Sequence, residues 1–181
     1  MTAQHDEAQE DPAGGEVLDA VVVGGSQAGL AMAWHLARQG LGFVVLEAAP
    51  ELGHTWRSRW DSLKLFTPAQ YDALPGMAFP APADTYPTKD PVVDYLQAYA
   101  AAFDLPIRLN ATVTELRRLE DGTFEVHTTD ATYQARQVVG GGTPGSRSPR
   151  GWPPPAPSTC RSPPPLRCCP SGWPVATCSG G

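Results

Sequence analysis

This 181-residue chain has no long apolar run, no cysteine in residues 1–142 and no Lys or Arg in residues 1–16. Each absence excludes a class of protein. All four cysteines fall within residues 143–181, so no disulfide framework holds residues 1–142 together. No run of roughly 18 or more apolar residues occurs, which excludes a membrane-spanning helix. Residues 1–16 contain five acidic residues and no Lys or Arg, the wrong charge for a secretory or transit peptide. We therefore expect a cytoplasmic protein.

Acidic residues are missing from residues 143–181, although the whole chain carries a formal net charge of −6. That segment holds 11 of the 20 prolines and four arginines, so residues 1–142 alone carry −10. Such an acidic domain lacks the clustered Lys and Arg of a nucleic-acid or anionic-membrane binder. The compositions predict a disordered start (1–16), one folded domain (17–142) and a disordered tail (143–181).

The tail has almost no aliphatic side chains and carries two proline triplets, so it cannot bury enough apolar area to become ordered. Its cysteines lack C-x-x-C spacing and histidine partners, which excludes a zinc site. Because the composition changes abruptly at the end of a predicted strand, we favour translation in a wrong reading frame as its origin. The alternative is a non-enzymatic fragment or adaptor that presents a Pro-rich segment to a recognition domain.

The first part of the folded domain has the pattern of a β-α-β unit. Residues 18–23 form a short, nearly continuous apolar run, which is typical of a parallel strand buried on both faces. Residues 28–39 carry apolar side chains at helical spacing, and Gly40 ends that helix. Residues 43–46 form a second buried strand, which ends at Glu47.

The remainder of the domain is less regular. Residues 48–90, rich in proline, aromatic and charged residues, predict a long irregular excursion over a site. Asp90 as N-cap and Pro91 as first helical residue predict a helix that runs to about Phe103. A small antiparallel meander is predicted from three strand-like segments, residues 111–118, 124–129 and 133–139.

A glycine-rich turn links the first strand to the first helix, as in dinucleotide-binding sites. The first glycine of such a turn allows the tight bend, the last allows close packing, and the helix N-terminus binds a pyrophosphate. Ser26 stands where a second glycine is usual, and its small hydroxyl can donate to a phosphate oxygen. Glu47 ends the second strand, where an acid accepts hydrogen bonds from ribose hydroxyls. The turn consists of Gly24, Gly25, Ser26, Gln27, Ala28 and Gly29.

This fingerprint does not separate FAD from NAD, so a NAD-binding dehydrogenase domain stays open beside a flavoprotein. A plain structural turn with a solvated Glu47 is a third interpretation. His35 and His127 are typical of packing or surface residues, and His54 has no evident acid partner. With no second His or Cys in register with them, no metal site is predicted and no catalytic residue is assigned.

Three motifs follow Glu47: GHTWRSRWDSLKLFTP at 53–68, LPG at 74–76 and YPT at 86–88. With them the chain resembles the flavin-containing monooxygenase-like family of FAD/NAD(P)H oxidoreductases, closest to bacterial flavoproteins that also resemble the plant YUCCA enzymes. The resemblance covers residues 18–139. It implies an α/β fold with a partial, Rossmann-type three-layer FAD-binding domain and a small antiparallel meander, followed by the disordered Pro-rich tail.

In that family the first Rossmann unit binds the ADP part of FAD, and a Gly-x-x-Trp-Arg segment crosses near the flavin. Trp56 with Trp60 can equally be an aromatic cover for the core, Arg57 part of a solvated face, and Val113 a core residue of its strand. Carried over to this chain, the resemblance implies a cofactor site made of the glycine turn, Glu47 at the ribose, the backbone of Val113 at the adenine, and Gly53, Thr55, Trp56 and Arg57 beside the cofactor.

The resemblance also implies a parent activity, FAD-dependent oxidation in which NADPH supplies electrons and one oxygen atom reaches a small-molecule substrate. Family members return to the main sheet with a strand that ends in Ala-Thr-Gly, and a second glycine fingerprint for NADPH follows. Here residues 136–139 run into Gly140-Gly141-Gly142, and the NADPH-binding half is absent. We therefore expect little or no monooxygenase turnover by this chain. Neither the substrate nor the oligomeric state is predicted.

Overall fold

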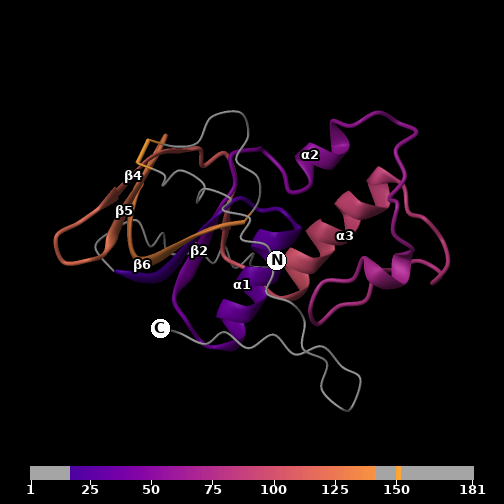
Figure 1. The fold of residues 1–181 in the computed structure, drawn as a ribbon, viewed down its shortest axis with the longest axis horizontal. Helices are drawn as coiled ribbons and strands as arrows, with labels where there is room; N and C mark the ends of the chain where they lie inside the picture. Colours follow the sequence, from indigo (N-terminus) through magenta and orange to yellow (C-terminus); the bar gives the residue numbers. More distant parts are fainter. Residues whose placement is uncertain (1–16, 142–149, 152–181) are drawn as a thin grey trace, which may run out of the picture.

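The structure is a computed structural model that describes residues 17–141 and 150–151. The disorder expected at residues 1–16 and 143–181 lies outside the described residues, apart from Arg150 and Gly151. Six strands form one mixed sheet in the order β3-β2-β1-β6-β5-β4 (Figure 1). The helices lie toward its parallel end and the antiparallel strands at the other (Figure 1).

The parallel half is built around β1 (Leu18–Val23), which pairs with β2 (Phe43–Leu46) on one side and β6 (Thr132–Gly140) on the other. α1 (Gln27–Arg38) is the crossover from β1 to β2. The predicted β-α-β unit is thus confirmed, with the helix one residue earlier than expected. Sequence reasoning missed β3 (Ile107–Arg108), a two-residue edge strand parallel to β2 that is too short for a periodic pattern.

The helix expected to begin with Asp90 as N-cap starts earlier. α3 (Lys89–Ala102) has Thr88 as its N-cap, so the predicted cap position was wrong and Pro91 is the third helical residue. Proline is tolerated there because the first four N–H groups of a helix have no intrahelical acceptor.

The excursion between β2 and α3 contains more order than the sequence indicates. It forms one helical turn, α2 (His54–Arg57), and a 3₁₀ turn, η1 (Ala69–Tyr71). Two stretches of it also run antiparallel, with a bridge between Lys64 and Thr88. Such single turns and bridges are too short to leave a periodic signal.

Two buried tyrosines of α3 fasten the middle of the excursion. The Tyr95 hydroxyl accepts from the N–H of Leu74 and donates to the carbonyl of Met77, both at 2.7 Å. The Tyr99 hydroxyl donates to the carbonyl of Pro75, also at 2.7 Å. The excursion is therefore held by side chains of α3 rather than by a ladder of its own.

The predicted antiparallel strands are present as β4 (Val113–Arg118), β5 (Phe124–Thr128) and β6. They are not a separate meander, because the nine-residue β6 pairs antiparallel with β5 and parallel with β1. The last meander strand and the strand that returns to the main sheet are one strand. Both halves therefore share one hydrogen-bonded sheet.

One residue of the tail, Arg150, pairs with the outer edge of β4. The N–H of Arg150 donates to the carbonyl of Thr114 at 3.2 Å, and the N–H of Leu116 donates to the carbonyl of Arg150 at 2.7 Å. At Arg150, therefore, the expected disorder of the tail is replaced by an isolated parallel bridge, and Gly151 follows as a turn.

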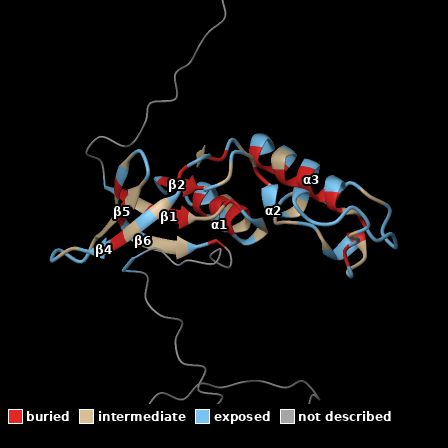
Figure 2. Cartoon of the chain, turned by 90° about the horizontal axis from the view of Figure 1, so that it is seen from above, coloured by how far each residue is buried: buried red, intermediate tan, exposed pale blue. Residues whose placement is uncertain are grey.

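Alternate residues of the parallel strands belong to two buried clusters. Buried residues are red in Figure 2. Val22 and Val45 pack with α1 and α3. Val21 and Val44 pack with Val126 and other residues of the antiparallel strands. One cluster thus joins the parallel strands to the helices and the other joins them to the antiparallel strands, which confirms the predicted α/β class.

Candidate functional site

The glycine turn between β1 and α1 is closed by backbone contacts that leave no room for side chains. Gly24 has a φ of 101°, which favours glycine. A Cβ on Gly29 would lie 2.0 Å from the carbonyl oxygen of Gly24. The first and last glycines of the fingerprint therefore have the two roles that the sequence predicts for them, a tight bend and a close approach.

A third glycine, Gly141 directly after β6, completes this contact. Its N–H donates to Val23 at 2.7 Å, and its carbonyl oxygen accepts from the N–H of Gly29 at 3.1 Å. The Ser26 hydroxyl donates to the same carbonyl, so in this structure it is turned to Gly141. Sequence reasoning singled out the Gly140-Gly141-Gly142 run only as a departure from Ala-Thr-Gly and missed its close approach to the turn.

Glu47, at the end of β2, faces the glycine turn. One carboxylate oxygen accepts from the N–H of Gly25 at 2.6 Å, and the other accepts from the N–H of Ala49 at 2.9 Å. A Cβ on Gly25 would lie 3.2 Å from the Glu47 carboxylate and 2.6 Å from Leu52. The two motifs that the sequence paired by spacing alone are thus in direct contact, and the start of the excursion lies beside them.

Gly53 begins α2 with a φ of 77°, and a Cβ there would lie 3.1 Å from Val93 of α3. Trp56 is half-buried and packs against the helix-side core. Arg57 is exposed and pairs with Glu51, with 2.9 Å from Nε to Oε1. The structure thus places Gly53 against α3, Trp56 on the core and the Arg57 guanidinium at the surface, while Thr55 is exposed.

Val113 is the first residue of β4 and is half-buried against the second core cluster. The chain just before it passes Glu47, since the N–H of Ala111 donates to the Glu47 carbonyl at 2.9 Å and the N–H of Glu47 donates to the Arg108 carbonyl at 2.8 Å. The predicted adenine-side residue is therefore close in the chain to the segment that lines Glu47.

Sequence reasoning also missed Lys89, the first residue of α3. Its ammonium lies 2.9 Å from the Asp61 carboxylate and donates to two backbone carbonyls of the excursion. The Lys89 ammonium lowers the pKa of Asp61, chiefly through their hydrogen bond. The available signal was a lysine at a helix start, where its charge opposes the helix dipole.

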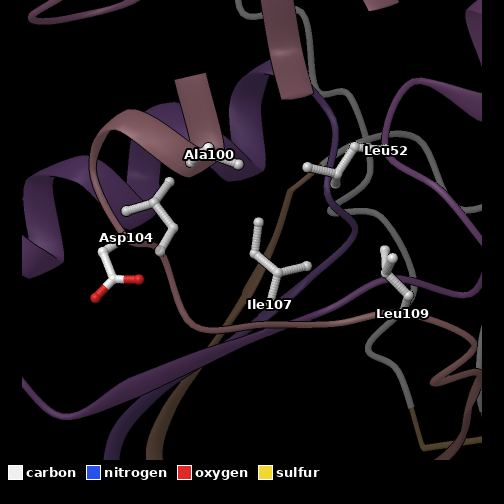
Figure 3. Close-up of a pocket in the computed structure, with 7 residues that line it drawn as sticks. Leu52, Ala100, Asp104, Ile107 and Leu109 are labelled. Carbon is white, nitrogen blue, oxygen red and sulfur yellow. The ribbon is translucent and has the colours of Figure 1, made fainter. Parts of the chain in front are cut away.

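A small apolar hollow lies between the end of α3 and β3. Its volume is about 240 Å³, below the roughly 300–1,000 Å³ of small-molecule pockets. Asp104 lies at one end of it and Leu109 at the other (Figure 3). The hollow is thus too small for a dinucleotide. It is lined by Leu52, Ala100, Ala101, Asp104, Leu105, Ile107 and Leu109.

Residues 17–141 and 150–151 bring no group of three His, Cys, Asp or Glu side chains together as a metal would require. Within the same part of the chain, no helix is both long and apolar enough to cross a membrane.

Comparisons with known proteins agree with this geometry. Residues 21–143 match the family described as pyridine nucleotide-disulphide oxidoreductase. An uncharacterized CzcO-like oxidoreductase of Geobacillus kaustophilus is 45% identical over 123 residues, which are 68% of this chain and 35% of that protein. The probable indole-3-pyruvate monooxygenase YUCCA7 of Arabidopsis thaliana is 44% identical over 94 residues, 51% of this chain and 22% of that protein.

Solved structures give the same result. The flavin-containing monooxygenase from Stenotrophomonas maltophilia is 33% identical with a TM-score of 0.64, over 70% of this chain and 38% of that one. The chain spans about a third of the length of the first curated relatives that it matches. It belongs to the pyridine nucleotide-disulphide oxidoreductase family, among the flavin-containing monooxygenase-like oxidoreductases, and its matched residues form the Rossmann-type part of that fold.

Proposed function

We propose that this chain binds FAD, as the FAD-binding portion of an NAD(P)H-dependent flavoprotein monooxygenase. The FAD pyrophosphate would lie at the β1–α1 turn and the adenosine ribose at Glu47. The supporting observation is the 2.6 Å contact between the Glu47 carboxylate and the N–H of Gly25, at the carboxyl ends of β1 and β2. Ligands of open α/β sheets bind at that edge, where strand order reverses, and β1 is flanked there by β2 and β6.

The residues at this edge fit a dinucleotide. The N–H groups of Gly29 and Leu30 are used within the protein, whereas those of Gln27 and Ala28 have no acceptor among the described residues. They are therefore free to donate to a pyrophosphate at the positive end of α1. The Glu47 carboxylate keeps lone pairs beyond its two backbone bonds and can accept from ribose hydroxyls.

The residues of the excursion would hold the other end of the cofactor. When bound, FAD supplies the redox chemistry. Trp56 would cover a face of the ring system, Thr55 would lie beside it, and the Arg57 guanidinium would exchange Glu51 for a diphosphate oxygen. Gly53 would let the chain pass close to the cofactor, and the backbone of Val113 would meet the adenine. These roles are carried over from the family, and those of Trp56 and Arg57 also suit the chemistry of their side chains.

We also propose an activity for the whole flavoprotein to which these residues would belong. It is the NAD(P)H-dependent oxidation carried out by the monooxygenases that the chain resembles. OTEMO, a solved relative in complex with FAD and NADP, is 25% identical with a TM-score of 0.61 over 70% of this chain. On this ground we propose NADPH as reductant. We also propose a small molecule as substrate and the cytoplasm as location, as expected from the sequence. For this chain alone we expect FAD binding without NADPH-driven turnover.

The test is a titration of the full chain with FAD and, separately, with NAD, followed by flavin fluorescence and absorbance. We expect FAD to bind and to stay bound through gel filtration, and NAD to bind weakly. E47Q removes the charge that accepts from ribose and should weaken FAD binding by about tenfold, or about 1.4 kcal/mol. The matched control is E120Q, the same change at an exposed residue of the β4–β5 turn, which should leave the affinity unchanged.

NAD binding with no FAD binding would favour a dehydrogenase domain, because Glu47 suits the ribose of either cofactor. Binding of neither cofactor would contradict the proposal, as would equal affinities in E47Q and the wild type.

A further inference from the structure

Lys89 is the one charged side chain that is buried among the described residues, with the residue 8% exposed. Burying a lysine ammonium is costly unless hydrogen bonds and countercharge replace its water. Lys89 also lies at the first position of α3, where the helix dipole disfavours a positive charge. Neither its burial nor its place at the start of a helix suits a lysine that only provides surface charge.

The ammonium of Lys89 is fully satisfied by residues of the excursion. It donates to the carbonyl oxygens of Arg57 at 3.2 Å and Arg59 at 3.1 Å, and it lies 2.9 Å from the carboxylate of Asp61. A lysine has three N–H donors, and here each has an acceptor. Arg57 ends α2, so Lys89 supplies a donor to a helix end whose last carbonyls have no intrahelical partner.

The other end of α2 also rests on α3. Gly53, the N-cap of α2, approaches Val93 so closely that a Cβ would lie 3.1 Å from its side chain. Lys89 and Val93 are four residues apart and so lie on one face of α3. That face therefore contacts α2 at its start, through Gly53, and at its end, through the carbonyl of Arg57, and Trp56 lies between the two contacts.

We propose that Lys89 is a positioning residue: it fixes residues 53–61 on α3 and thereby sets Trp56 and Arg57 in the orientation that receives the flavin. This inference rests on the FAD binding proposed above. The two carbonyl contacts do the positioning, because the Asp61 side chain is fully exposed and an exposed ion pair contributes little.

The experiment compares FAD titrations of the full chain in the wild type, K89M, K89R and D61N, with the visible spectrum of the bound flavin as second readout. K89M keeps the length and apolar stem but has no donors, and we expect about tenfold weaker binding with a shifted flavin spectrum. K89R can still donate to both carbonyls and should restore the spectrum. D61N should stay within about threefold of the wild type.

A matched control separates positioning from general destabilisation. V126A opens a cavity in the core cluster on the opposite face of the sheet, so it should lower stability without changing the flavin spectrum. Wild-type affinity and spectrum in K89M would overturn the proposal, and so would the same spectral shift in V126A. If K89M does not fold, K89Q replaces it. Its side-chain amide keeps one donor group, so we expect a smaller loss of affinity and a smaller spectral shift than for K89M.

Amide hydrogen exchange tests the positioning role of Lys89 without FAD, and so separately from the proposed function. If the wild type binds no FAD, the proposed function fails, yet K89M must still accelerate exchange in residues 53–61 relative to V126A. Unchanged exchange there would overturn the positioning role by itself.

Discussion

Two parts of the candidate site are held in opposite ways. The glycine turn is held by backbone, through Gly29 and Gly141 packed on the carbonyl of Gly24. The α2 segment is held by side chains of α3, through an ammonium whose acceptors lie 30 and 32 positions away in the chain. Backbone contacts of this kind require glycine and leave a fingerprint in the sequence. Side-chain contacts to carbonyls require only a long donor, and they leave almost none.

The largest expected loss of stability comes from a substitution in the glycine turn, which is held by backbone contacts. G29A would place a Cβ 2.0 Å from the carbonyl oxygen of Gly24, and neither backbone can yield without moving β1 or α1. We expect a loss of about 3 kcal/mol or more in the free energy of unfolding, because overpacking here has no flexible side chain to relax. Urea unfolding followed by circular dichroism measures it.

G42A is the control for that change. Gly42 precedes β2, and the nearest atom to a Cβ there is an Asp19 carboxylate oxygen at 3.9 Å, an ordinary contact. The unfolding free energy should change by less than about 1 kcal/mol in either direction. A similar loss in G42A and G29A would show that the turn is not specially crowded.

The next largest effect is a pH-dependent loss of stability in the excursion, which is held by side chains of α3. Burial raises the pKa of Tyr99, whose hydroxyl donates to Pro75, to about 12. The unfolded phenol ionises near pH 10, so only the unfolded state releases this proton between about pH 10 and 12. The stability due to Tyr99 is complete below pH 10 and falls by about 2–3 kcal/mol as pH rises to 12.

Y99F tests this pH dependence. It should cost about 1 kcal/mol at pH 8, from the lost bond to the Pro75 carbonyl, and should lose less stability than the wild type between pH 8 and 11. Urea unfolding at both pH values gives the comparison. Burial also raises the pKa of Tyr95, so part of the alkaline loss should remain in Y99F. Identical losses in the two proteins would mean that the excursion does not bury the Tyr99 phenol.

The smallest effects compare the two helix starts. Ser26 and Thr88 are the N-caps of α1 and α3, and neither side chain makes the usual capping bond. Ser26 donates instead to Gly141, so S26A should cost about 1 kcal/mol. T88A should cost less than about 0.5 kcal/mol, below the usual cost of losing a cap. Thermal unfolding of both variants measures the order, and a larger loss in T88A would contradict it.

The part of the fold that the sequence predicts well is the part whose pattern is local. β1 and β2 each show a short apolar run, and α1 shows helical spacing that ends at Gly40. The double pairing of β6 is not local, because it joins β6 to β1 at the start of the folded chain, with Ala135 paired to Leu18, as well as to β5. A sequence pattern predicts which residues form a strand, but not which strands pair with it on its two edges.

The same division applies to the site. Glu47 could be assigned to the glycine turn because both follow strands that end at one edge of the sheet. Gly141 and Lys89 could not be assigned in this way. The contact of Gly141 depends on where β6 ends, and the main partners of Lys89 are carbonyl groups, which every residue carries. The Thr88 cap was missed because Asp90 and Pro91 form a stronger local signal two positions later.

The central place of β1 in the sheet depends on a strand that is synthesised late. β1 and β2 leave the ribosome first, and the second edge of β1 stays open until β6 follows. An open, apolar strand edge is a template for pairing with other chains. During its synthesis the chain therefore exposes an unpaired edge of β1 until the residues through Gly140 have emerged.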